Sequence, residues 1–164
     1  MAFDAFIQLE GIKGESTDDK HKDWIEIQNY GFGASQPQSS TASSSGNLGS
    51  ARVEIQNFTF VHNLDISSPK LFEYCCTGQT VPKVTITLNR AGGDKSKYME
   101  YKLTDAIVTS VGRGGDSNAD QDVPIESVTL AFGKVEMTYT KIGIDGKAAG
   151  NASAGWDLKK NVKV

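Results

Sequence analysis

The stretch KVTITLNRAGGDKSKYMEYKL, residues 83–103, decides the class of fold. Val84, Ile86 and Leu88 alternate with polar residues, which is the pattern of a β-strand with one buried face. A glycine-rich turn at 91–94 then leads into a second extended run, so the stretch predicts a β-hairpin. The two-residue period dominates the chain and the helical period is nearly absent. We therefore expect a mainly β protein.

Other segments extend this pattern along the chain. We expect further strands over residues 3–9, 24–32, 52–62, 106–111, 125–140 and 156–164. The parity of the apolar positions changes within 52–62 and near Gly133, which predicts a bend or bulge at both places. We expect a kink at Thr104–Asp105. Residues 143–155 are rich in glycine and alanine and are expected to form a loose connection.

One short α-helix is predicted in this β-rich chain. Ser68 is the expected N-cap, Pro69 the first helical residue and Gly78 the C-terminal cap. The side chains expected to face a sheet are those of Leu71, Phe72, Cys75 and Cys76. Seven or eight strands and one helix in 164 residues predict a single domain, residues 1–164, built as a barrel or a sandwich around one core.

A long serine-rich loop is predicted over residues 33–50. Its 18 residues include seven serines and three glycines, and Leu48 is nearly its only hydrophobic residue. Such a composition builds no core. Loops of this length either mediate an interaction or stay mobile at the surface, and both interpretations are open at this point.

Charge and composition limit the possible partners and compartments. The 17 basic residues are scattered among 20 acidic ones, so no concentrated basic face predicts nucleic-acid binding. No apolar stretch approaches the roughly 20 residues that span a bilayer. The N-terminal residues carry no basic leader and no apolar core, so we expect synthesis and folding in the cytoplasm without a signal peptide. Cys75 and Cys76 are expected to be reduced and buried.

The sequence lacks the usual catalytic patterns. The sequence has no nucleophile elbow, phosphate-binding loop, zinc-protease motif or Cys-x-x-Cys pair. Its two histidines, His21 and His62, are expected to be exposed or structural. We therefore predict no enzyme activity, no cofactor and no metal site. A rival class is a monomeric β-sandwich that binds carbohydrate, in which Trp24, Tyr30 or Trp156 would stack on sugar.

Several motifs in order along the chain resemble one known family. They are MAFDAFI at 1–7, GIKGES at 11–16, SSPKL at 67–71, RAGG at 90–93 and GWDLKKNVKV at 155–164, the last containing Trp156, Asn161 and Val162. Together they resemble the haemolysin-coregulated protein (Hcp) family, the tube subunit of bacterial type VI secretion. The resemblance covers the full length of the chain.

The resemblance implies a two-sheet β-barrel with one helix, six copies in a ring, and rings stacked into a hollow tube. A contractile sheath would propel this tube, tipped by a VgrG-like spike protein, out of the cell, and effector proteins would travel in its lumen. Assembly in the cytoplasm and secretion through the type VI system follow. The loop residues expected to contact a neighbouring subunit or ring are Gln36, Gln38, Ser40 and Leu48, and the expected lumen residues are Gly31 and Ser35.

Overall fold

A computed structural model of the chain describes residues 3–37, 52–115, 117 and 122–164. In chain order its elements are β1 (Phe3–Leu9), β2 (Ile25–Ile27), β3 (Asn29–Gly31), β4 (Ala34–Ser35), β5 (Glu54–Ile55), β6 (Phe58–Asn63), α1 (Ser68–Thr77), β7 (Thr80–Arg90), β8 (Lys97–Gly114), β9 (Ile125–Ala131), β10 (Lys134–Ile142), β11 (Ala148–Asp157) and β12 (Val162–Lys163). The described part of the chain is mainly β with one short helix, as predicted.

Ten strands form one branched sheet, and β4 and β5 form a separate two-stranded ribbon. The main path runs β12-β11-β10-β8-β7-β1-β2, and a branch runs from β8 through β9 and β6 to β3. All of these pairs are antiparallel. The predicted hairpin over residues 83–103 is confirmed as β7 and the start of β8.

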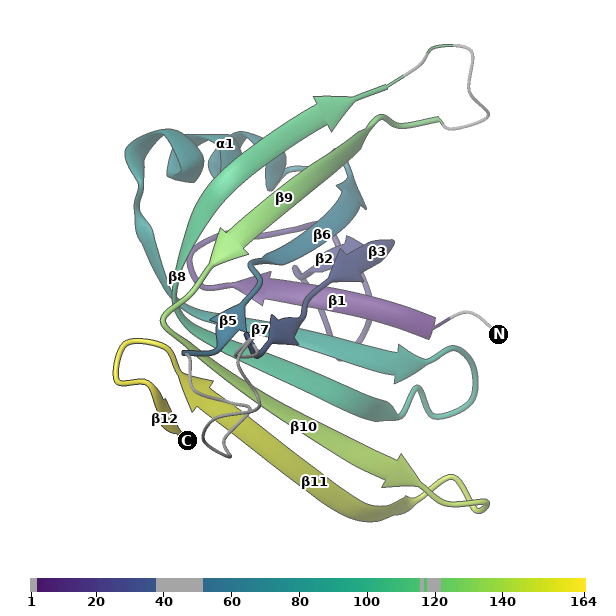
Figure 1. Ribbon diagram of the computed structural model, residues 1–164. Helices are drawn as coiled ribbons and strands as arrows, with labels where there is room; N and C mark the ends of the chain where they lie inside the picture. The colour runs from purple at the N-terminus through teal and green to yellow at the C-terminus, as the bar shows by residue number, and fades with distance from the viewer. Residues whose placement is uncertain (1–2, 38–51, 116, 118–121) are drawn as a thin grey trace, which may run out of the picture.

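Strand β8 is the branch point because it is long and sharply bent. Its first half pairs with β10 and its second half with β9. The bend falls at Asp105, which has a φ of 53°, and Figure 1 shows the two halves running in different directions. The kink predicted at Thr104–Asp105 is therefore confirmed.

The expected two-sheet barrel is not confirmed in the described residues, because the sheets do not close. Strand β2 pairs with β1, whereas β3 pairs with β6. The chain passes from β2 to β3 at Gln28, whose N–H donates to the carbonyl of Val61 at 2.8 Å. The serine-rich loop lies mostly outside the described residues, which resume at Arg52.

The core lies on one face of the branched sheet. Leu9, Val84, Leu103 and Val135 form a row across four neighbouring strands, and each is at most 2% exposed. The branch strands supply further apolar side chains, with Phe58 and Phe60 of β6 both fully buried. Each fully buried side chain of this size contributes about 1.5–3 kcal/mol.

Aromatic rings fill the space between the main path and the branch. Phe32 and Phe58 have ring centroids 6.2 Å apart, and Tyr101 lies 5.9 Å from Phe32 and 6.1 Å from Phe58. Burial, and next a hydrogen bond to Tyr30, raise the pKa of Tyr101 well above its usual range.

The opposite face of β1 is covered by the segment before β2. Phe6 points away from the core, yet it is only 6% exposed. Its ring stacks on His21 at 4.4 Å, and Trp24 stands edge-on to His21 at 4.9 Å. The segment can pass this close because Gly14 has no side chain: a Cβ there would lie 2.4 Å from the Trp24 carbonyl oxygen.

Helix α1 differs from the prediction at its N-terminus and in its buried face. Ser67, not Ser68, is the N-cap, while Gly78 adopts the left-handed conformation as its C-cap, as expected. The buried helix residues are Ser68, Leu71 and Tyr74. The prediction that Phe72, Cys75 and Cys76 face a sheet is wrong for Phe72 and Cys76, which are exposed, and Cys75 is half-buried. Successive helical residues differ by about 100°, so the buried stripe passes through 71 and 74 and leaves 72 and 76 outside it.

Candidate functional site

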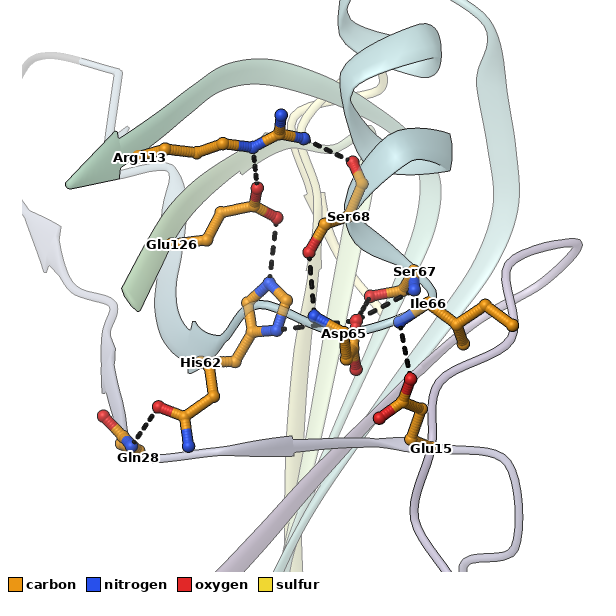
Figure 2. Close-up of polar contacts among 10 residues, drawn as sticks. Glu15, Gln28, His62, Asp65, Ile66, Ser67, Ser68, Arg113 and Glu126 are labelled. Carbon is orange, nitrogen blue, oxygen red and sulfur yellow. Dashed lines mark hydrogen bonds and ion pairs between the residues drawn. The ribbon is translucent and has the colours of Figure 1, made fainter. Parts of the chain in front are cut away.

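A buried polar cluster lies at the base of α1, where three neighbouring strands meet (Figure 2). His62 of β6 pairs in register with Glu126 of β9, and Glu126 pairs in register with Arg113 of β8. Both His62 and Glu126 are 0% exposed. The Nε2 atom of His62 lies 3.0 Å from Oε1 of Glu126.

The other carboxylate oxygen of Glu126 binds Arg113. The Nε–H of Arg113 donates to Oε2 of Glu126, and its Nη2 donates to the carbonyl of Ser68 at 2.7 Å. The guanidinium carbon also lies 5.4 Å from the centre of the Phe72 ring, a cation–π distance. One arginine therefore joins β8, β9 and the first turn of α1.

Asp65 caps helix α1, because the side chain of the N-cap residue Ser67 makes no capping hydrogen bond. Its Oδ1 accepts hydrogen bonds from the backbone N–H of Ser67, at 2.8 Å, and from the Ser67 hydroxyl. The backbone N–H of Asp65 donates in return to the hydroxyl of Ser68 at 3.1 Å. These reciprocal bonds satisfy groups that a helix start leaves unpaired. Asp65 Oδ1 also lies 3.9 Å from Nδ1 of His62.

The cluster is held from outside by two further contacts. Glu15 accepts a hydrogen bond from the N–H of Ile66 at 3.0 Å, and Gln28 donates to Asn63 at 2.8 Å. The arrangement fixes α1 to the sheet through charged groups. Buried ion pairs of this kind cost free energy to desolvate, so they set geometry more than they add stability.

The apolar pattern of β6 and β9 indicates two of the buried positions of this cluster. His62 shares the parity of the buried Phe58 and Phe60, and Glu126 shares that of Val128 and Leu130, so both lie on the apolar face of their strands. His62 was expected to be exposed or structural, and its full burial supports the structural role. Arg113, which precedes a glycine-rich turn, carried no such signal.

The structure places the predicted assembly residues as follows. Gly31 is exposed at the end of β3, Ser35 is exposed in β4, and Gln36 follows it and is also exposed. Gln38, Ser40 and Leu48 lie outside the described residues. The lumen and ring-contact roles of these six residues stay predictions.

The residues of the C-terminal motif lie on β11 and β12. Trp156 of β11 pairs in register with Val135 and is half-buried against the core. Asn161 has a φ of 55°, which turns the chain into β12, where Val162 is 48% exposed. The connection expected over 143–155 is largely wrong, because residues 148–155 belong to β11. The small residues there carry no alternation of apolar and polar side chains, and they form a strand by pairing with β10.

The aromatic residues of the rival sugar-binding class have different surroundings. Tyr30 stacks on Phe58 at 5.8 Å and contacts Tyr101, and Trp156 packs on the core. Trp24 is half-buried and lines a surface pocket. Within the described part of the chain no group of three or more His, Cys, Asp or Glu residues could hold a metal ion. No helix in those residues is long and apolar enough to cross a bilayer.

The sheet, the helix and the cluster define a mainly β protein in which one helix is fixed to a branched sheet by buried charges. Residues 6–139 match the family model described as "Type VI secretion system effector, Hcp". The chain belongs to the Hcp family of the type VI secretion system, as its motifs predicted.

Individual relatives agree with this assignment over their whole length. Protein hcp1 of Pseudomonas aeruginosa is 33% identical over 166 residues and is covered completely, as is this chain. A solved structure described as that of a type six secretion system protein has a TM-score of 0.93 and 32% identity, covering 99% of this chain and 100% of its own. The crystal structure of Hcp1 from Salmonella typhimurium has a TM-score of 0.79 and 32% identity, with both chains fully covered.

Proposed function

We propose that this chain is the structural subunit of a type VI secretion inner tube, in which six copies form a ring and the rings stack. The observation that carries this proposal is the full-length match to Hcp proteins in sequence and in fold. The subunit would assemble in the cytoplasm, meet a VgrG-like spike and a contractile sheath, and leave the cell with effector proteins in the lumen. In this role the chain needs no catalytic group.

The outer edge of β11 supports association with another copy. Among the described residues, no strand pairs with this edge from Ala148 to Ala154, because β12 reaches only Trp156 and Asp157. The edge residues, AAGNASA, include no charge and no proline, the features that usually protect a free edge. A neighbouring subunit in a closed ring would cover such an edge.

The oligomeric state of the purified protein tests the proposal. Light scattering coupled to size exclusion should give a mass of six subunits, and negative-stain images should show annular particles. Ala152→Lys, which places a charge on the β11 edge, should give folded monomers, whereas Thr17→Lys, at an exposed position away from it, should still form rings. A wild-type protein that stays monomeric contradicts the tube function. Rings formed by Ala152→Lys contradict only the role of the β11 edge.

Stacking is assigned to the loop that contains Gln36, Gln38, Ser40 and Leu48, and lumen lining to Gly31 and Ser35. Deleting residues 36–49 should leave the rings intact and prevent tube growth, because the loop would no longer reach the next ring. Negative-stain images of concentrated samples measure this. Tubes of normal length from the deletion variant would refute the stacking role.

A further inference from the structure

The imidazole ring of His62, in the cluster of Figure 2, has one nitrogen paired and the other unpaired. Its Nε2 lies 3.0 Å from the carboxylate of Glu126, and an ionised carboxylate only accepts hydrogen bonds, so Nε2 carries a hydrogen. In the neutral ring Nδ1 is then a bare acceptor, and it is buried without a hydrogen-bond partner among the described residues. An unpaired buried polar atom is normally costly and needs an explanation.

A second carboxylate faces the unpaired nitrogen. Oδ1 of Asp65 lies 3.9 Å from Nδ1 of His62, which is beyond hydrogen-bond length but within the range of an ion pair (Figure 2). In the neutral ring two acceptors therefore face each other, and both are largely shielded from water, since 1% of the His62 side chain and 12% of the Asp65 side chain are exposed. A proton on Nδ1 turns this repulsion into a charge-assisted hydrogen bond after a small movement of Asp65.

The cluster has an excess of negative charge that a proton on His62 would partly neutralise. Glu126 of β9 and Asp65, which precedes α1, lie directly beside the ring. Glu15, from the segment before β2, binds the backbone next to Asp65. The cation that the described residues bring to this cluster is Arg113 of β8, and its guanidinium already binds Glu126. Three carboxylates therefore surround one guanidinium and one imidazole.

Asp65 is shared between the imidazole ring and the start of α1. Its Oδ1, the atom that faces His62, also accepts a hydrogen bond from the N–H of Ser67 at 2.8 Å. Its own N–H donates to the hydroxyl of Ser68 at 3.1 Å. A contact that holds Asp65 in place therefore also holds the first turn of α1, and a contact that repels Asp65 loosens that turn.

We infer that His62 is a proton-dependent latch for helix α1. With a proton on Nδ1, the ring donates to Glu126 and to Asp65 and so joins α1 to strands β6 and β9. Without that proton, Nδ1 and Oδ1 of Asp65 repel each other, and the first turn of α1 opens more often. Histidine is the side chain whose charge normally changes between about pH 5 and pH 8, so α1 is attached more firmly at acidic than at alkaline pH. This inference does not depend on the proposed tube function.

Amide hydrogen exchange in the first turn of α1, measured at about pH 5.5 and about pH 8.5, tests the latch. After correction for the intrinsic exchange rate, the amide of Leu71, which donates to the carbonyl of Ser67, should exchange about tenfold faster at the higher pH, because a charge-assisted hydrogen bond is lost. Asp65→Asn should lose most of this difference, because the asparagine oxygen still caps the helix but carries no charge. The matched control Glu15→Gln, which removes a carboxylate that does not face the ring, should keep the difference.

A measurement on the wild-type protein covers the case in which a variant fails to fold. The chain has two histidines, His21 and His62, so their ring nitrogen signals in NMR spectra can be assigned with the single variant His21→Gln. His62 should carry hydrogens on both nitrogens at about pH 5.5 and on Nε2 alone at about pH 8.5. A His62 ring in one protonation state at both pH values overturns the latch. Equal corrected exchange of the Leu71 amide at both pH values, or an unchanged difference in Asp65→Asn, overturns it as well.

Discussion

Replacing Glu126 with alanine should destabilise the protein strongly, because this carboxylate has charged or polar partners on both sides. Its side chain is 0% exposed and binds His62 at 3.0 Å and Arg113. Removing one member of a buried pair costs about 3–5 kcal/mol, since the partners lose their counter-charge. The Arg113 side chain is 41% exposed and can regain water, so we expect the lower end, about 3 kcal/mol.

The size of this effect can be measured by denaturation. For a chain of this length about 3 kcal/mol corresponds to a drop in melting temperature of about 6–12 °C. Urea unfolding and thermal unfolding should be followed at two protein concentrations, because association raises apparent stability. The double variant Glu126→Leu with His62→Leu should lose less than Glu126→Ala, because it leaves no orphaned histidine. A loss below about 1 kcal/mol for Glu126→Ala, or a larger loss for the double variant, would refute this reasoning.

Two further perturbations follow from the same structure. Gly14→Ala should lower the free energy of unfolding in urea by about 1–3 kcal/mol, because the new Cβ would lie 2.4 Å from the Trp24 carbonyl oxygen. The control Gly31→Ala, whose Cβ would have nothing within 4 Å, should cost under about 1 kcal/mol. Equal effects of the two substitutions would contradict the close approach at Gly14. The hydrogen bond from Lys95, and next that from His21, lower the pKa of Asp18 in the folded protein. Its ionised carboxylate therefore stabilises the fold above pH 3.8, the ordinary pKa, and this stabilisation is lost as the pH falls below 3.8. Between about pH 5 and pH 2.5, the melting temperature of Asp18→Asn should therefore drop less than that of the wild type. Parallel curves would exclude Asp18 as a source of the acid sensitivity.

The strands were predictable where one face is apolar and the other polar. The segment 83–90 alternates because β7 has the core on one side, and the strand boundaries there are close to those observed. The parity changes within 52–62 and near Gly133 were interpreted as bends or bulges inside single strands, and the structure has breaks there, between β5 and β6 and between β9 and β10. Strand β11 could not be predicted, because small exposed residues carry no alternation and its conformation depends on pairing with β10.

The polar sites were predictable only in part, since they depend on contacts between distant segments. His62 and Glu126 are 64 residues apart and meet only through strand register. His21 was expected to be exposed or structural, and it is buried because the segment before β2 folds over Phe6. Phe6 is the one exception to the apolar–polar alternation in β1, and this exception indicates that a segment covers the second face of the strand.

The bent strand β8 also constrains how the chain reaches its folded state. Strand β8 pairs with β7, β9 and β10, so neither the main path nor the branch completes its core until β8 is in place. The branch also needs β6 to meet β9, which closes a loop of more than 60 residues, and such long-range pairing slows folding. Loss of β8 would expose the core of the main path and of the branch together, so the two should unfold as one cooperative unit.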